Sequence, residues 1–174
     1  MILFSSISLM IFLSFSSHFQ NYPAPPKTNE LLFYIQRNHN SNTIVYDANF
    51  DSNGNLKEDE PIVVYWIRYD DDGEKMELRT IEKLYAYGVD WEKVEGKNMY
   101  ELTMVADNSH IFMLEQTEPF KAIVTTQINK TQSVLESMYI FADNSKAWPT
   151  VEYIEFFGYN KNSKLKEYEK VIVD

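Results

Sequence analysis

Short apolar segments separated by polar turn formers dominate the chain from residue 31 onward. They are rich in β-branched and aromatic residues, and clusters of Asn, Asp, Gly, Ser and Lys divide them, a pattern typical of antiparallel strands. Turn-forming residues at 37–42, 129–132 and 160–163 predict hairpins between neighbouring strands. We therefore expect about nine strands, at 31–36, 43–50, 61–69, 99–106, 110–115, 120–128, 134–142, 151–158 and 165–173.

The segment 61–69 is apolar on both faces, unlike the strands that alternate. Ile62, Val64 and Trp66 point to one side, and Val63, Tyr65 and Ile67 point to the other. A strand of this kind is buried on both sides, which predicts a central position in the sheet.

The period changes to that of a helix between residues 76 and 87. Leu78, Ile81, Leu84 and Tyr85 recur at helical spacing, and Gly88 stands where a helix C-cap is expected. The sequence thus predicts one amphipathic helix that covers a sheet face or plugs the end of a barrel. The predicted fold class is mainly β, either an antiparallel meandering barrel or a two-layer sandwich with this one helix, and the pattern does not distinguish the two.

The chain divides into three parts. Residues 1–17 carry no charged side chain and form an apolar stretch shorter than the ~20 residues that span a bilayer, which predicts an export signal and a periplasmic or extracellular protein. The positive segment usual before such a signal is missing, so an uncleaved membrane anchor or a misassigned start stays open. Residues 18–30, with Pro23, Pro25 and Pro26, predict an extended tether, and residues 31–174 predict a single domain.

Charge and composition exclude several classes of partner and of functional site. Sixteen basic against twenty-six acidic residues give a formal net charge of −10, so we expect no nucleic-acid partner, and also no attraction to anionic lipid surfaces. Cysteine is absent, which excludes thiol nucleophiles, thiolate metal sites, disulfides and a lipid-attachment cysteine. After processing we therefore expect no stable membrane insertion.

Motifs for catalysis and metal binding are weak. The three histidines, His18, His39 and His110, are not at metal-ligand spacing, and the segment from Asp51 to Asn55 fits a turn better than a calcium loop. We expect no metal and no cofactor. The strands offer carboxylates that could pair for glycoside hydrolysis, but acidic residues are so common that this carries little weight: Glu136, Glu152, Glu155, Glu167 and Glu169.

Three charged residues fall on otherwise apolar strand faces. Alternation places Arg37 with Phe33 and Ile35, Arg68 with Trp66, and Asp47 with Val45. Because an isolated buried charge is costly, Asp47 is the expected partner of either arginine, in a salt bridge that closes the end of a barrel or sandwich. Alternatively an arginine binds a carboxylate, a phosphate or a sugar hydroxyl. The candidate ligand-binding residues are Arg37, Asp47, Trp66 and Arg68.

Four segments are more specific than a general β pattern: Tyr34-Ile35-Gln36-Arg37, residues 42–49, residues 61–69 with the centre Val64-Tyr65-Trp66-Ile67, and Ala86-Tyr87-Gly88. Together they resemble a bacterial family catalogued as domain of unknown function 4833. The resemblance implies a secreted bacterial protein and brings no catalytic residues with it.

These observations favour a non-catalytic binding or interaction module, with a small molecule, a sugar or a protein as its ligand. The alternative is a hydrolase that acts on a cell-envelope or carbohydrate substrate through strand carboxylates. A third possibility is a structural envelope component without a small ligand.

Overall fold

The computed structural model describes residues 22–143, 145 and 149–173. The expected export signal at 1–17 lies outside these residues, so export and its periplasmic or extracellular destination remain predictions. The described chain is mainly β, as predicted. Eleven strands form its sheet: β1 Leu31–Arg37, β2 Asn40–Ala48, β3 Ile62–Arg68, β4 Glu74–Glu77, β5 Val89–Lys93, β6 Met99–Met104, β7 Asp107–Glu118, β8 Lys121–Ile128, β9 Thr131–Asp143, β10 Thr150–Asn160 and β11 Lys166–Ile172.

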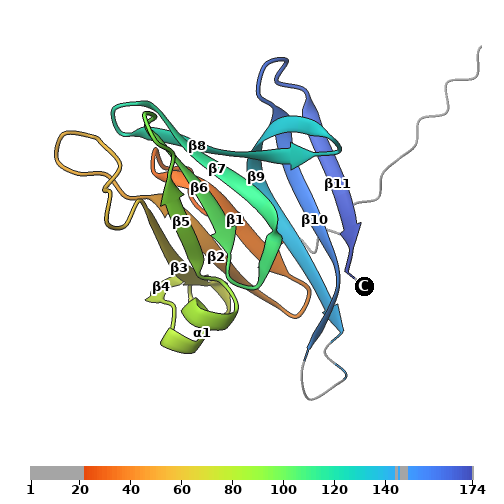
Figure 1. Ribbon diagram of the computed structural model, residues 1–174. Coiled ribbons are helices and arrows are strands. Elements are labelled where there is room, and N and C mark those ends of the chain that lie inside the picture. Colours follow the sequence, from red (N-terminus) through yellow and green to blue (C-terminus); the bar gives the residue numbers. More distant parts are fainter. Residues whose placement is uncertain (1–21, 144, 146–148, 174) are drawn as a thin grey trace, which may run out of the picture.

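The strands belong to one curled sheet with the order β4-β3-β2-β1-β9-β8-β7-β6-β5, from which β10 and β11 branch at β9 (Figure 1). The long strand β9 makes this branch possible. Its first residues pair with β8, its later residues pair in parallel with β1, and β10 runs along its other edge. The sheet is therefore mixed, and the expectation of a purely antiparallel sheet is wrong at the β1–β9 pair.

The three predicted hairpins are present. Arg37 pairs with Asn40 across the two-residue turn between β1 and β2. Asn129 and Lys130 both have positive φ, 50° and 64°, as a two-residue turn between twisted antiparallel strands requires. The β10–β11 turn is closed by Asn160, whose Oδ1 accepts the backbone N–H groups of Asn162 and Ser163.

The predicted helix is only half as long as expected. Helix α1 spans Thr80–Tyr85, while two strands that the pattern did not predict, β4 and β5, take the flanking residues. Pairing with β3 commits the backbone of Glu74–Glu77 to a ladder, so these residues cannot be helical. Gly88 lies so close to the helix that a Cβ there would be 1.8 Å from the Lys83 carbonyl oxygen. Across the described residues, no helix is long and apolar enough to cross a membrane.

The apolar stripe of α1 does not cover a sheet face or plug a barrel end. Leu78, just before the helix, is buried, but Ile81, Leu84 and Tyr85 are 60–74% exposed. The short helix instead links β4 and β5, the two ends of the main strand order (Figure 1).

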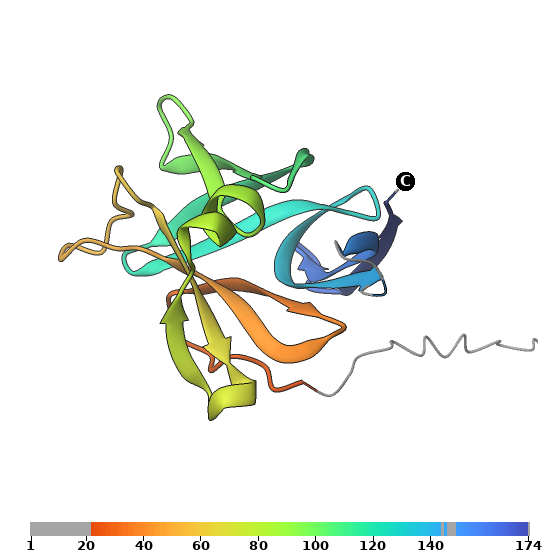
Figure 2. The same ribbon diagram turned by 90° about the horizontal axis from the view of Figure 1, so that it is seen from below.

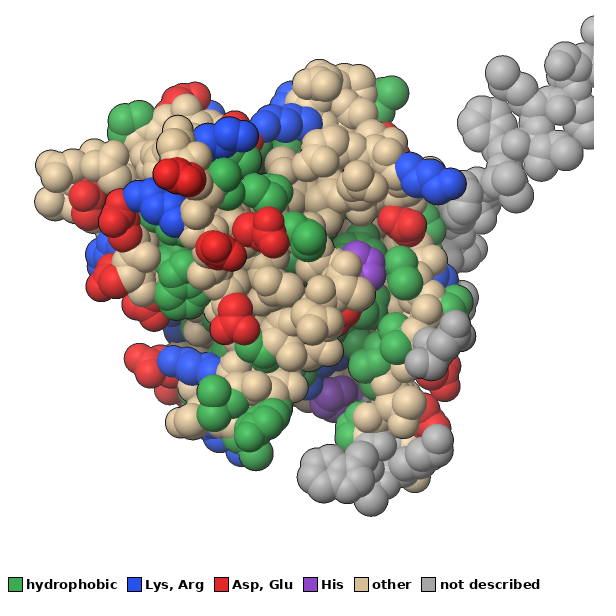
Figure 3. Space-filling model, in the orientation of Figure 1, with side chains coloured by type: hydrophobic (Ala, Val, Ile, Leu, Met, Phe, Trp, Pro, Cys, Tyr) green, Lys and Arg blue, Asp and Glu red, His purple; other side chains and the backbone are tan. Residues whose placement is uncertain are grey.

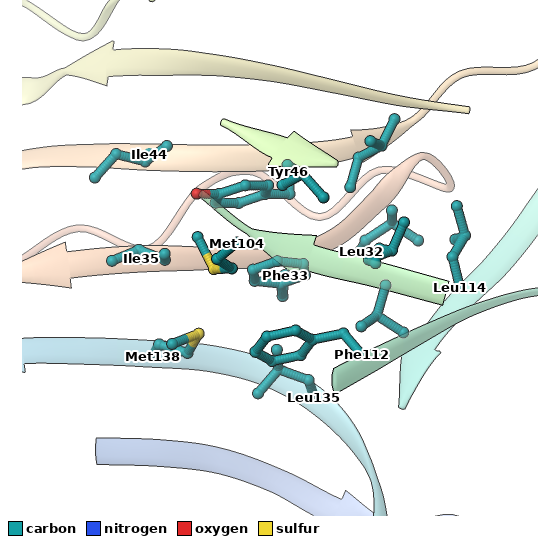
Figure 4. Close-up of a cluster of buried hydrophobic side chains, with 14 of the residues drawn as sticks. Leu32, Phe33, Ile35, Ile44, Tyr46, Met104, Phe112, Leu114, Leu135 and Met138 are labelled. Carbon is teal, nitrogen blue, oxygen red and sulfur yellow. The ribbon is translucent and has the colours of Figure 1, made fainter. Parts of the chain in front are cut away.

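The main core lies on the inner, concave face of the sheet, where side chains from β1, β2 and β3 meet those from β6 to β10. Phe33 stacks on Tyr46 with ring centroids 4.3 Å apart and faces Phe112 at 6.2 Å (Figure 4). A smaller cluster on the outer face contains Val45, Tyr65 and Ile67. Strand β3 is therefore covered on both faces, as predicted, but the predicted central position is wrong, because β3 is the neighbour of the short edge strand β4.

Residues 22–30 have no helix or strand, as expected for a tether, but they pack against the sheet (Figure 2). Gln36 Nε2 donates to the Pro23 carbonyl oxygen at 3.0 Å, and the Tyr69 hydroxyl donates to that of Ala24 at 3.0 Å. Pro25 is buried. This part of the expected tether is thus an ordered cover of the outer face.

Candidate functional site

A pocket of about 710 Å³ opens beside the β1–β2 turn and helix α1. All three arginines of the chain line it, Arg37 from β1, Arg68 from β3 and Arg79 from the residue before α1. Trp66 and Tyr87 form its aromatic wall, and Glu82 is the one carboxylate among its lining residues in the described chain. We call this the arginine pocket. It concentrates positive charge in a protein whose net charge is −10.

Arg37 lies at the centre of the polar contacts in this pocket. Its Nη1 donates to the Tyr87 hydroxyl at 2.7 Å, and its Nη2 donates to Asn40 Oδ1 at 3.2 Å. The guanidinium carbon lies 4.7 Å from the Trp66 ring centroid and 5.5 Å from that of Tyr87. The two rings are nearly perpendicular, with centroids 5.3 Å apart, so they hold the guanidinium in an aromatic corner.

The charge of Arg37 is not neutralised by a neighbouring carboxylate. Within residues 22–143, 145 and 149–173, it forms no ion pair, and its Nε is buried without a hydrogen-bond partner. A guanidinium has five N–H donors, and two of those of Arg37 are used. Arg37 therefore keeps its charge, and the unused N–H groups of Nη1 and Nη2, rather than the buried Nε, are the donors that would bind an anion.

Arg79 and Glu82 form a closed unit at the start of α1. Glu82 Oε1 accepts from Arg79 Nε at 3.0 Å and from Nη2 at 2.6 Å, while Oε2 accepts from the Arg79 backbone N–H and from Trp66 Nε1. Burial alone would raise the pKa of Glu82, but these hydrogen bonds lower it below its usual value. Glu82 thus stays ionised, neutralises Arg79, and fixes the orientation of the Trp66 ring.

Arg68 is ion-paired, but less firmly than Arg79. It pairs with Asp71 at 2.5 Å, but both side chains are between about one-third and one-half exposed. Its Nη1 also lies 3.7 Å from the sulfur of Met76. An exposed pair of this kind contributes little and can rearrange, so Arg68 can reach a ligand at the pocket mouth.

His39, in the β1–β2 turn, also lines the pocket. Its partial burial and, after that, the nearby charge of Arg37 lower its pKa below the usual value of 6.5, and Asp70 only partly offsets this. The imidazole is therefore neutral at pH 7 and becomes a further cation in acid.

The structure brings together three of the four predicted ligand-binding residues and excludes Asp47. Arg37, Trp66 and Arg68 line the arginine pocket, whereas the Asp47 carboxylate lies on the outer face and accepts a 2.8 Å hydrogen bond from the Tyr65 hydroxyl. The predicted salt bridge between Asp47 and an arginine is therefore wrong. Burial is the main reason that the pKa of Asp47 is raised.

Three of the five carboxylates considered for hydrolysis already have structural partners. Glu155 accepts from the Tyr168 hydroxyl at 2.6 Å, Glu169 accepts from the Asn129 backbone N–H, and Glu136 pairs with Lys166. In the described part of the chain, no three acidic or histidine side chains gather into a possible metal site.

Ser109, His110 and Asp107 come together without the geometry of a catalytic triad. The Ser109 hydroxyl and the Asp107 carboxylate approach the same ring atom of His110, Nδ1, at 3.1 and 2.9 Å. A triad needs the carboxylate on one ring nitrogen and the hydroxyl on the other. The cluster therefore links side chains at the start of β7 and does not activate the serine.

Sequence reasoning missed several residues of the site, above all Tyr87 and Glu82. Both follow from the position of α1, whose true start the helical spacing did not reveal. Glu82 accepts from the Arg79 backbone N–H as the Glu of a capping box does, but arginine cannot accept a hydrogen bond at the N-cap, so the sequence carried no capping-box signal for this helix start.

Comparison with known protein families gives a match. No curated protein and no solved structure matches the chain significantly. The family model described as "Domain of unknown function (DUF4833)" matches residues 33–170, which include nearly all of the sheet and every described lining residue of the arginine pocket named above. The chain therefore belongs to the family of domain of unknown function 4833.

Proposed function

We propose that the protein is a non-catalytic binding module whose arginine pocket binds an organic anion, a small molecule that carries a carboxylate or a phosphate. The observation that carries this proposal is Arg37, a guanidinium with unused donors and without a carboxylate partner among the described residues. Arginine matches carboxylate and phosphate oxygens in pairs, and such charge-assisted hydrogen bonds are the strong ones.

The pocket also suits the organic part of such a ligand. Its volume of about 710 Å³ falls within the range of ~300–1,000 Å³ usual for small-molecule sites. Trp66 and Tyr87 offer aromatic surface beside the guanidinium, which favours a ring or a chain over a bare inorganic ion.

The proposal also gives a role to the Arg79–Glu82 unit. Because Glu82 is saturated by Arg79 and Trp66, its negative charge does not reach into the pocket to repel an anion. The unit thus positions the aromatic wall, while Arg37 and Arg68 supply the charge.

The test is isothermal titration calorimetry with matched anionic and neutral ligands, glucuronate and glucose 6-phosphate against glucose. We expect the two anions to bind and glucose not to bind, and Arg37→Gln to weaken anion binding about 10–100-fold, the loss of one charge-assisted contact.

Lys75→Gln is the matched control. It removes one positive charge from the outer face, where Lys75 lies over the Tyr65 ring, 3.5 Å from its centroid. Binding that is equally weak in both variants would mean that net charge alone attracts the anion, and would overturn the site.

A further inference from the structure

A second cavity, of about 330 Å³, lies inside the curled sheet next to the arginine pocket. Its walls are mainly apolar, and it opens between the central strands and the β10–β11 branch, where Figure 3 shows a hollow lined by hydrophobic side chains. The polar residues at its edge, Asp107, Ser109 and His110, bond to one another and leave the wall apolar. We call it the apolar cavity.

The floor of this cavity is built from two rows of side chains across β1, β9 and β10. In the first row, Ile35 pairs with Met138, and Met138 pairs with Phe156. Since side chains two residues apart share a strand face, the next row lies on the same surface. It consists of Arg37, Ile140 and Ile154.

Arg37 therefore lies at the edge of the apolar floor, as the β1 member of the second row. Arg37 is the direct neighbour of Ile140 in the β1–β9 ladder and follows Ile35 on one strand face, about 7 Å along β1. Tyr87 separates the two spaces and lines both of them, together with Ala86. Its hydroxyl accepts from Arg37, and its backbone carbonyl is fixed by the buried Tyr46 hydroxyl at 3.0 Å.

We infer that the two spaces form one site for a single-chain amphiphilic anion. The carboxylate or phosphate head binds Arg37 in the arginine pocket, and the acyl chain runs past Tyr87 over Ile140 into the apolar cavity. This inference rests on the proposed function for the head group and adds the chain as the determinant of specificity. A cavity of this size with apolar walls is in the range of ligand sites and well above the voids of packed interiors.

Isothermal titration with butanoate, decanoate, decyl phosphate and decanol, each below its micelle concentration, tests the inference. We expect decanoate and decyl phosphate to bind at least about ten-fold more tightly than butanoate, because each buried CH₂ adds favourable transfer free energy. Arg37→Gln should reduce the affinity for decanoate to that for decanol.

A variant that fills the cavity separates the chain from the head. Val171, half-buried on the edge strand β11, lines the cavity, so Val171→Trp should remove the preference for decanoate over butanoate and leave butanoate binding intact. Leu165→Trp is the matched control, since Leu165 is 68% exposed and lines neither space. The wild-type chain-length series does not depend on whether either variant folds.

The outcomes distinguish the inference from the proposed function. Butanoate binding that needs Arg37, without a gain from the longer chain, would overturn the inference and leave the proposed function standing. Decanol that binds as tightly as decanoate, regardless of Arg37, would show a separate apolar site and overturn the joined site. No binding of any anion would overturn both.

Discussion

Strands β1 to β3 carry a half-buried guanidinium, Arg37, on the inner face of the sheet and a half-buried carboxylate, Asp47, on the outer face, and the two groups are held differently. Asp47 Oδ2 accepts a hydrogen bond from Tyr65, and Lys75 lies over the same ring, so the outer carboxylate has one donor and a nearby cation, while its Oδ1 is buried without a hydrogen-bond partner in the described part of the chain. Arg37 has aromatic rings and neutral acceptors around it, and no carboxylate among the described residues. The outer face compensates part of its charge with the Tyr65 hydroxyl and the nearby Lys75, while Arg37 on the inner face forms no ion pair within the described residues and leaves its charge for a ligand.

The difference follows from strand register. The two-residue turn pairs Arg37 with Asn40, so Asp47 lies seven residues farther along β2, about 23 Å away at the rise of a strand. Asp47 pairs with Val63 in β3, about 17 Å from Arg68 along the strand. Two charges on neighbouring strands can pair only when both register and face agree, and here neither agrees.

The largest expected difference between the faces is in packing energy. Phe33→Ala should lower the free energy of unfolding by about 3–5 kcal/mol, because Phe33 is buried between Tyr46 and Phe112. Val63→Ala, at a half-buried position of the outer face, should cost about 1 kcal/mol. Urea unfolding measures both, and equal losses would contradict the division into a main inner core and a minor outer cluster.

Ligand binding should depend on the inner charge and not on the outer one. We expect Arg37→Gln to weaken binding of glucuronate about 10–100-fold, while Asp47→Asn changes it less than about two-fold. Calorimetry on both variants at one ionic strength decides this. A strong effect of Asp47→Asn would mean that the two faces are coupled through the sheet.

The hydrogen bond from the Tyr65 hydroxyl to Asp47, on the outer face, should stabilise the fold in a pH-dependent way. Tyr65→Phe leaves the buried Asp47 carboxylate without its donor and should cost about 1–2 kcal/mol at pH 7. Burial raises the folded pKa of Asp47, so the carboxyl favours its protonated form and its cost to stability grows as pH rises through that pKa. The penalty of the variant should therefore shrink from pH 7 toward pH 4, and a constant penalty would contradict the role of the carboxylate.

The smallest effect concerns His39. Its folded pKa lies below 6.5, so its contribution to stability is complete above pH 6.5 and is lost as pH falls through the folded pKa. His39→Gln should flatten the stability curve in this window. Protonation of His39 adds a cation beside Arg37, so anion affinity should rise in acid in the wild type and rise less in the variant. An identical pH dependence in both proteins would show that His39 lies outside the site.

The strand pattern predicted most of the fold because alternation is set by burial, and the hairpins followed from their turn residues. Strands β4 and β5 were missed because Glu74–Glu77 and most of Val89–Lys93 are exposed and carry no apolar alternation. The helical stripe of Ile81, Leu84 and Tyr85 predicted a longer helix packed on the sheet. This prediction was wrong because those side chains, although apolar, are exposed.

The candidate site was predictable where it depends on faces of single strands, and not where it depends on distant segments. Arg37, Trp66 and Arg68 were identified from their apolar surroundings, and the structure brings them together. The predicted turn at 37–42 already opposed a pairing of Arg37 with Asp47, but the register had to be counted to see it. Tyr87 reaches Arg37 from fifty residues away, through contacts that no local pattern contains.

The most direct test of the central claim is a ¹H–¹⁵N spectrum of the arginine side chains during titration with glucose 6-phosphate. The chain has three arginines, so the Nε region should show three signals, which Arg→Lys variants assign. We predict that the signal of Arg37 shifts most and saturates, and that the signal of Arg79, held by Glu82, shifts least. An Arg37 signal that stays in place while the ligand is added would contradict the assignment of this pocket as an anion site.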